Sequence, residues 1–188
     1  MGDHLRSPRI GCAVLSLAVL LLAACSGEKE PEVEYAVPDA LCGVPTGTEA
    51  VEPFFPPGSK LTKTGGALND GKYASGCDYA VDSAKTLMVS DFFHEDIPTA
   101  RQIAQKRAAD YGDGDTKVVV SDNVAVYSRG AVAVEPCRGY PSDTDGLPRK
   151  SFSVEIVAYY PKDLAKQEKT LTRLVTKLVP AVAKANGC

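Results

Sequence analysis

One histidine and its acidic neighbours are the residues of this chain best suited to general acid–base chemistry or metal binding. His94 lies between Asp91 and Asp96, so an imidazole has carboxylates close to it along the chain. Such a group can act as a general base or as a metal ligand. The alternative is an exposed strand end that leads into a helix, where Glu95 and Asp96 favour the positive N-terminus. Because no His-Glu-x-x-His motif is present, we favour this structural interpretation.

Other motifs that carry chemistry are weak or absent. Asp110, Asp113 and Asp115 form one acidic cluster, and Asp143 and Asp145 form another, but neither has the spacing of a calcium loop. Asp-Gly sequences are also common in ordinary turns. The chain has no Gly-x-Ser-x-Gly nucleophile motif, no phosphate-binding P-loop and no Gly-x-Gly-x-x-Gly motif after a strand. We therefore expect no catalytic residues, no cofactor and no metal.

The cysteines indicate an oxidising environment. After position 25 the sequence holds an even number of them, with no Cys-x-x-Cys pair, and His94 has no cysteine at zinc-ligand spacing. Chains of this kind usually form disulfides outside the cytoplasm. Spacing alone leaves the pairing open, and links from the first of them to either of the last two are alternatives. We expect the pairs Cys42–Cys77, which ties the entry segment to an early strand, and Cys137–Cys188, which fixes the C-terminal residue.

The N-terminus has the organisation of a secretory signal. Arg6 and Arg9 precede an apolar run that ends in Leu22-Ala23-Ala24-Cys25. The run is too short to span a bilayer comfortably, which takes roughly 20 residues. A cysteine directly after small residues resembles the lipobox of bacterial lipoproteins. That resemblance implies cleavage after residue 24 and a diacylglyceryl group on the Cys25 thiol, and two acyl chains anchor a protein stably.

Composition bounds the remainder. The 188-residue chain has a net charge of −3, with its charges spread along the sequence. We therefore expect no basic stripe and no nucleic-acid partner. Residues 26–38 are acidic and contain prolines, which predicts a disordered tether after the lipidated cysteine. We divide the chain into a signal peptide (1–24), a lipidated cysteine with tether (25–38) and one extracytoplasmic domain (39–188).

Alternating apolar and polar residues predict strands in two blocks. The first block is a hairpin that turns at 82–85, and the second is a meander followed by a long polar loop at 139–150. In the final strand Phe152, Val154 and Ile156 face one way, while Ser153 and Glu155 face the other. The expected strands are 72–81, 86–93, 116–120, 124–128, 131–135 and 151–160.

Two amphipathic helices complete the expected fold. The first spans 96–111, with Thr99 and Gln102 as a capping box. The second spans 162–186, with Asp163 as a cap and Pro180 as a kink or interruption. Its apolar stripe is expected to pack on the sheet and consists of Leu164, Leu171, Leu174, Val175, Leu178 and Val182.

A short helix around 48–54 is also possible. Together these elements describe an α+β domain, in which an antiparallel sheet of about six strands is packed by a middle helix and a long C-terminal helix.

The mature chain resembles the small cysteine-bearing lipoproteins of unknown function that are abundant in actinobacteria. The resemblance rests on the lipobox, the acidic tether, Leu41-Cys42-Gly43 at the start of the domain and Gly76-Cys77-Asp78-Tyr79 on an early strand. The element order also resembles the PsbP-like α/β sandwich, which is an analogy at the level of fold. Cys188 as the last residue departs from this pattern. The resemblance implies no catalytic residues.

These observations favour a non-enzymatic binding or accessory protein, lipid-anchored on the outer face of the cell membrane. It would engage another envelope protein or a small ligand through the sheet face or the 139–150 loop, where Arg138 and Tyr140 are candidate contacts. One alternative is an envelope hydrolase that uses His94 with Asp91 or Asp96. Another is a lipid or small-ligand carrier with a cavity between helix and sheet, lined by residues such as Phe92, Val154 and Leu174.

Overall fold

The fold is taken from a computed structural model that describes residues 32–68, 74–110, 119–121, 123–140 and 149–188. The side chains of 119–121 and 138–140 are not described. The expected signal peptide and Cys25 lie outside these residues. Within them, no helix is long and apolar enough to cross a membrane.

An antiparallel sheet of seven strands forms the centre of the domain, in the order β3-β4-β5-β9-β8-β7-β6. Two helices pack on it, which confirms the predicted α+β class. A separate two-stranded hairpin precedes the sheet and consists of β1 (Ala40–Leu41) and β2 (Val44–Pro45). The strands of the sheet are β3 (Leu61–Gly65), β4 (Ala74–Val81), β5 (Ala84–His94), β6 (Val119–Ser121), β7 (Val124–Tyr127), β8 (Gly130–Tyr140) and β9 (Arg149–Ala158).

The strand that the sequence did not predict is β3, at one edge of the sheet. Its sequence, Leu-Thr-Lys-Thr-Gly, has no alternating apolar face, and it pairs with β4 alone in the seven-stranded sheet. Lys63 is exposed at this edge. A short, polar edge strand with an exposed lysine discourages pairing with a second molecule. The same polar composition hides the strand from a search for alternating apolar residues.

Two of the tight hairpins turn through two residues with positive φ. Asp82 and Ser83 (φ 48° and 70°) join β4 to β5, and Cys42 and Gly43 (φ 48° and 85°) join β1 to β2. Positive φ at both central residues suits the right-handed twist of a hairpin. The Asp82 carboxylate also accepts hydrogen bonds from the backbone amides of Ser59 and Lys60, which holds the first turn against the preceding loop.

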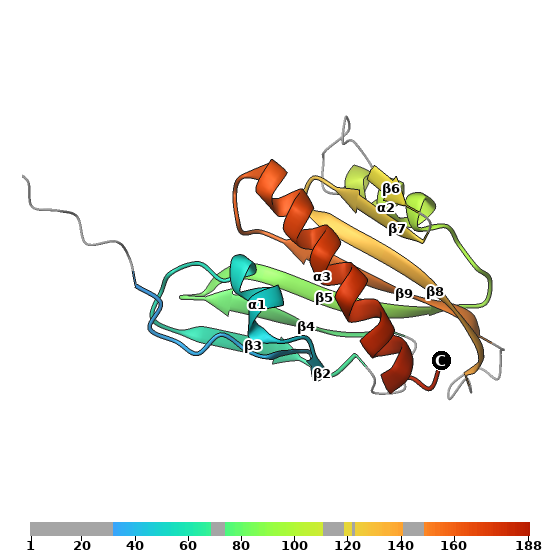
Figure 1. The fold of residues 1–188 in the computed structure, drawn as a ribbon, viewed down its shortest axis with the longest axis horizontal. Helices are drawn as coiled ribbons and strands as arrows, with labels where there is room; N and C mark the ends of the chain where they lie inside the picture. Colours follow the sequence, from blue (N-terminus) through green and yellow to red (C-terminus); the bar gives the residue numbers. More distant parts are fainter. Residues whose placement is uncertain (1–31, 69–73, 111–118, 122, 141–148) are drawn as a thin grey trace, which may run out of the picture. The chain divides into compact units, whose positions relative to one another are not determined.

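Helix α3 (Leu164–Ala185) covers one face of the sheet, where it lies in front of the strands in Figure 1. The main hydrophobic core lies between them and also takes in α1 (Thr48–Val51) and the 3₁₀ helix η1 (Glu52–Phe54). At the centre of this core, Phe152, Ile156, Leu174 and Leu178 are fully buried. Burying each such side chain contributes about 1.5–3 kcal/mol.

Helix α2 (Ala100–Asp110) covers the opposite face, over β7 and β8 (Figure 1). Its small side chains Ala100, Ala104 and Ala108 pack against Tyr127 and the neighbouring valines of β8. The small side chains let the helix approach the strands closely and form a second, smaller apolar cluster.

The capping box at the start of α2 is present as predicted. The Gln102 amide donates to the Thr99 hydroxyl at 3.2 Å, and the Thr99 amide donates to the Gln102 side-chain oxygen at 2.9 Å. The helix therefore begins at Ala100, four residues later than predicted, because Thr99 is its cap rather than its interior.

Two expectations for α3 need correction. Leu164 does not pack on the sheet: it is 55% exposed in the first turn, just after the cap that Asp163 provides to Lys166. Pro180 does not interrupt the helix, which continues to Ala185 with Pro180 exposed. The other members of the predicted apolar stripe are buried.

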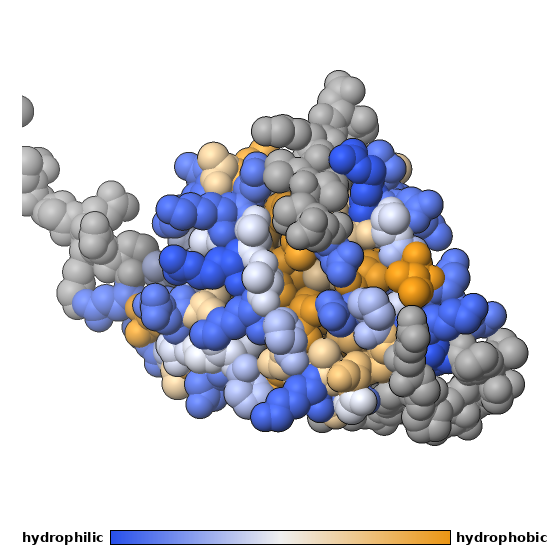
Figure 2. All heavy atoms as spheres, turned by 45° about the vertical axis from the view of Figure 1, so that its right-hand side comes forward, coloured by the Kyte–Doolittle hydropathy of each residue, from blue (hydrophilic) through white to orange (hydrophobic). Residues whose placement is uncertain are grey.

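Most large apolar side chains of the described residues are inside. The exceptions, each about half exposed, are Val33, Ile97 and Leu164. Figure 2 shows apolar surface in the middle of one side, surrounded largely by hydrophilic residues. Folded proteins commonly keep some apolar surface exposed, so this area carries no conclusion by itself.

The described end of the expected tether contacts the domain. Val33 forms a parallel bridge with Gly58, and the Glu34 amide donates to the Gly58 carbonyl at 2.9 Å. The Tyr35 hydroxyl donates to the Pro56 carbonyl. Residues 32–35 are therefore held against the loop that precedes β3, although their composition is that of a linker.

Two disulfides join the pairs expected from the sequence. Cys42 and Cys77, whose Cα atoms are 5.5 Å apart, link the β1–β2 turn to β4. Both cysteines are buried in the main core. Cys137 and Cys188, whose Cα atoms are 5.0 Å apart, link β8 to the residue that ends the chain after α3.

Candidate functional site

Among the described residues, one part of the sheet is covered on a single face only. Along most of β4 and β5, alternate residues are buried on the side of the main core, whereas the residues between them are partly exposed on the side of α2. In β5 the partly exposed set is Met88, Ser90, Phe92 and His94. Helix α2 packs over β7 and β8 and leaves this area uncovered. We call the uncovered area formed by β3, β4 and β5 the open sheet face.

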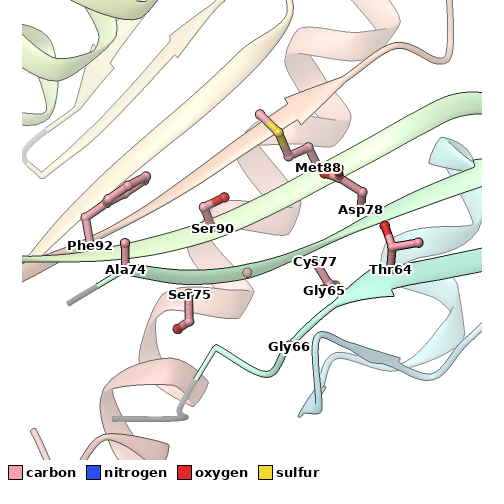
Figure 3. A pocket seen from close by; sticks show the side chains of 11 residues that line it. Thr64, Gly65, Gly66, Ala74, Ser75, Cys77, Asp78, Met88, Ser90 and Phe92 are labelled. Carbon is pink, nitrogen blue, oxygen red and sulfur yellow. The ribbon is translucent and has the colours of Figure 1, made fainter. Parts of the chain in front are cut away.

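A hollow of about 460 Å³ lies at the open sheet face. Figure 3 shows Phe92, Ser90 and Met88 projecting from β5 on one side of the strands, with Ser75 pointing to the other. The volume falls in the range of small-molecule sites. The lining residues are Thr64, Gly65, Gly66, Ala74, Ser75, Gly76, Cys77, Asp78, Met88, Ser90 and Phe92.

Gly76 creates the hollow. It pairs with Ser90 on β5, and a Cβ at this position would come within 2.9 Å of the Ser90 Cα atom, closer than real side chains allow. Gly65 on β3 has φ of 88°, and a Cβ there would come within 2.9 Å of the Cys77 Cα atom. Glycines in strands often mark such close approach of backbones. The two positions therefore leave the floor of the hollow as bare backbone.

Phe92 forms one wall and is held from the side of α2. The guanidinium carbon of Arg107 lies 5.5 Å from the centre of the Phe92 ring, a distance typical of a cation–π contact. Arg107 also donates through Nε to the Glu155 carboxylate at 2.6 Å. Glu155 is nearly fully buried on β9. This arrangement satisfies a buried carboxylate and fixes the position of the aromatic wall.

The opposite end of the hollow is polar and acidic. Asp78 projects beside Met88, its partner across the strands, and forms an exposed ion pair with Lys85 at 3.2 Å. Exposed pairs of this kind are weak, so Asp78 can exchange Lys85 for another cation or donor. The hollow thus offers an aromatic ring and a thioether next to hydroxyls and one carboxylate. Aromatic residues and methionine are enriched at protein interfaces.

His94 is joined to a serine rather than to a carboxylate. Its Nε2 atom lies 2.9 Å from the Ser153 hydroxyl on β9. Ser153 has no exposed surface, so its hydroxyl cannot reach a substrate from solvent. Burial lowers the pKa of His94, while nearby Asp96 and Glu155 act in the opposite direction. The pair is best explained as a hydrogen bond that holds the end of β5 against β9.

The two carboxylates suggested as partners of His94 have other roles. Asp91 is fully buried and faces α3, on the other side of the sheet from His94, and its Oδ1 accepts a hydrogen bond from Ser75 at 2.5 Å. Asp96 accepts from the Ser151 hydroxyl through its backbone carbonyl. Residues three apart on a strand point to opposite faces, so Asp91 and His94 cannot form a catalytic pair.

The carrier alternative receives little support from the packing. Val154 and Leu174 are fully buried members of the main core, and Phe92 lies on the opposite face of the sheet. The structure therefore does not bring the three suggested lining residues together.

Several candidate residues lie outside the described part. The side chains of Arg138 and Tyr140 are among these, although their backbones belong to β8, and so are Asp113, Asp115, Asp143 and Asp145. Asp110 is exposed and lies 3.8 Å from Arg107. Among the described residues, no group of three or more metal-ligating side chains is close enough to hold a metal ion.

Comparison with known proteins finds no protein family, no curated protein and no solved structure that matches the chain.

Proposed function

We propose that this chain is a lipid-anchored extracytoplasmic binding protein that engages a protein partner through the open sheet face. The observation that carries the proposal is the hollow around Gly76, a feature of an otherwise close-packed sheet. Its aromatic and thioether side chains are partly exposed, whereas most residues on the other face of the same strands are buried.

A protein partner suits this surface better than a buried small ligand. The hollow has the volume of a small-molecule site but is open on one side, so a small ligand would keep one face in solvent, whereas a side chain projecting from a protein would be covered by that protein. Phe92, pinned by Arg107, presents a rigid aromatic contact. Rigid aromatic anchors beside a pocket are typical of the residues that dominate binding energy.

Support for the anchor comes from the N-terminal sequence and the disulfides. Cys25 directly follows small residues and an apolar run, and two disulfides are typical of proteins in an oxidising compartment. The expected result for Cys25→Ser is a chain that leaves the membrane fraction and lacks the mass of a diacylglyceryl group. Fractionation of expressing cells and intact mass measurement check this, and an unmodified Cys25 in the wild-type chain would refute the anchor alone.

Ser90→Arg tests the binding surface. Ser90 lies across from Gly76 and is partly exposed, so an arginine fills the hollow while its charge reaches solvent. We expect recovery of the partner, cross-linked on intact cells and quantified by mass spectrometry, to fall at least about tenfold, as for loss of an interface anchor. Ala109→Arg is the matched control, because Ala109 is exposed on α2 and adds the same charge.

Equal recovery with both variants would overturn the surface assignment. Native mass spectrometry of the wild-type chain provides the other decisive readout. An additional small mass that is lost on denaturation and absent from Ser90→Arg would assign the hollow to a small ligand instead of a protein.

A further inference from the structure

The exposed side of α3 carries a continuous row of cations that the linear sequence conceals. Lys166, Lys169, Arg173, Lys177 and Lys184 are all exposed. At 3.6 residues per turn they fall within about 80° of the helix circumference, and they extend over about 27 Å at 1.5 Å per residue. We call these five residues the basic stripe.

The described part of the domain does not neutralise the basic stripe. No ion pair joins any of its five members to another residue among those described. The only acidic residue within α3, Glu168, lies on a different side of the helix, because it is two positions from Lys166. Pro180, also exposed, completes the row without adding a charge. This corrects the expectation of no basic stripe.

We propose that the basic stripe docks the domain onto a lipid bilayer that contains anionic headgroups. The chain as a whole has a net charge of −3, so its charge is strongly polarised between this helix face and the remainder. A straight row of exposed, flexible cations along one helix face matches a flat polyanionic surface. Each lysine or arginine near such a surface contributes about fivefold in binding.

The membrane is favoured over nucleic acid by location. Disulfides at Cys42–Cys77 and Cys137–Cys188 are typical of proteins outside the cytoplasm, where a protein does not meet the cell's own nucleic acids but does meet a lipid surface. The inference does not depend on the lipid anchor or on the open sheet face, because the stripe belongs to the folded domain and lies on the other side of the sheet. Its failure would leave both earlier proposals intact.

The test uses the lipid-free chain from Ser26 onward, because residues 31–188 form one compact unit that contains every core residue. Sedimentation with phosphatidylcholine vesicles, with and without phosphatidylglycerol, measures binding. We expect binding only to the anionic vesicles, and a loss of that binding at high salt. The stripe variant is Lys166→Glu, Lys169→Glu, Arg173→Glu and Lys177→Glu.

A matched control changes the same net charge elsewhere, at four exposed cations: Lys60→Glu, Lys63→Glu, Arg101→Glu and Lys106→Glu. The stripe variant should bind at least about 100-fold more weakly than wild type, whereas the control should lose less than about tenfold. Equal losses would show that net charge and not the stripe determines binding, and would overturn the proposal.

Lysine footprinting tests the proposal on the unaltered chain. With an amine-reactive reagent, Lys166, Lys169 and Lys177 should be protected on anionic vesicles, while Lys60 and Lys63 stay reactive. Uniform reactivity would overturn the proposal. So would binding to an oligonucleotide without binding to the vesicles, which would assign the stripe to nucleic acid.

Discussion

Removal of the buried disulfide is expected to lower the free energy of unfolding by about 4 kcal/mol. Cys42 and Cys77 are separated by 35 residues, and the bond restricts that loop in the unfolded chain. Both cysteines are also buried in the main core, so Cys42→Ala with Cys77→Ala leaves a gap as well. For a domain of this size the melting temperature should fall by about 10 °C. Guanidinium unfolding and calorimetry measure both values.

The second disulfide provides the matched comparison. Cys137 and Cys188 are separated by 51 residues, but only Cys137 is buried, so Cys137→Ala with Cys188→Ala should cost the entropic part with a smaller loss of packing than the first pair. The buried pair should therefore be the more damaging to remove. Unchanged unfolding of the wild-type chain after reduction would contradict the account for both pairs.

Asp91→Asn is expected to stabilise the domain at neutral pH. Burial raises the pKa of Asp91 to about 6, an effect only partly offset by the hydrogen bond from Ser75 and by the nearby side chain of Asn186. Its Oδ2 atom has no hydrogen-bond partner among the described residues. A charged carboxylate is therefore held in the core at pH 7. Asparagine keeps the shape and the contact with Ser75, and it removes the charge.

The sign of the pH dependence follows from the raised pKa. The unfolded chain ionises Asp91 near pH 3.8, before the folded chain does, so stability falls as the pH rises from about 4 to about 6. The loss is on the order of 2–3 kcal/mol. His94, with a lowered pKa, has the opposite effect, since its stabilisation is lost as the pH falls below about 6.5.

Unfolding at several pH values separates the two groups. The difference between wild type and Asp91→Asn isolates Asp91, and a His94→Gln background removes the competing slope. If Asp91→Asn were less stable than wild type at pH 7, with an unchanged pH profile, the buried carboxylate would be a stabilising group and the account of this site would be wrong.

The sequence predicted those parts of the fold whose residues follow a clear strand alternation or a known helix-capping pattern. The alternation in 151–160 placed Phe152 and Ile156 under α3, and Thr99 with Gln102 marked the start of α2. The strand β3 was missed because threonines and a lysine at an edge give no apolar alternation.

The candidate site depends on contacts across strands that no local pattern reveals. Gly76 is one glycine among sixteen, and only its register against Ser90 shows that it opens a hollow. By contrast, the sequence itself argues against pairing Asp91 with His94, since residues three apart on a strand lie on opposite faces of the sheet. The basic stripe can also be predicted from the sequence, because its cations recur at helical spacing within the predicted C-terminal helix.

Site-specific photocross-linking in intact cells is the most direct test of the open sheet face. The photoreactive residue p-benzoylphenylalanine replaces Ser90 in one variant of the full chain and Ala109 in the other. The account predicts one discrete cross-linked protein product from position 90 and none from position 109. No product from position 90, or the same products from both positions, would contradict the claim that this face binds a partner.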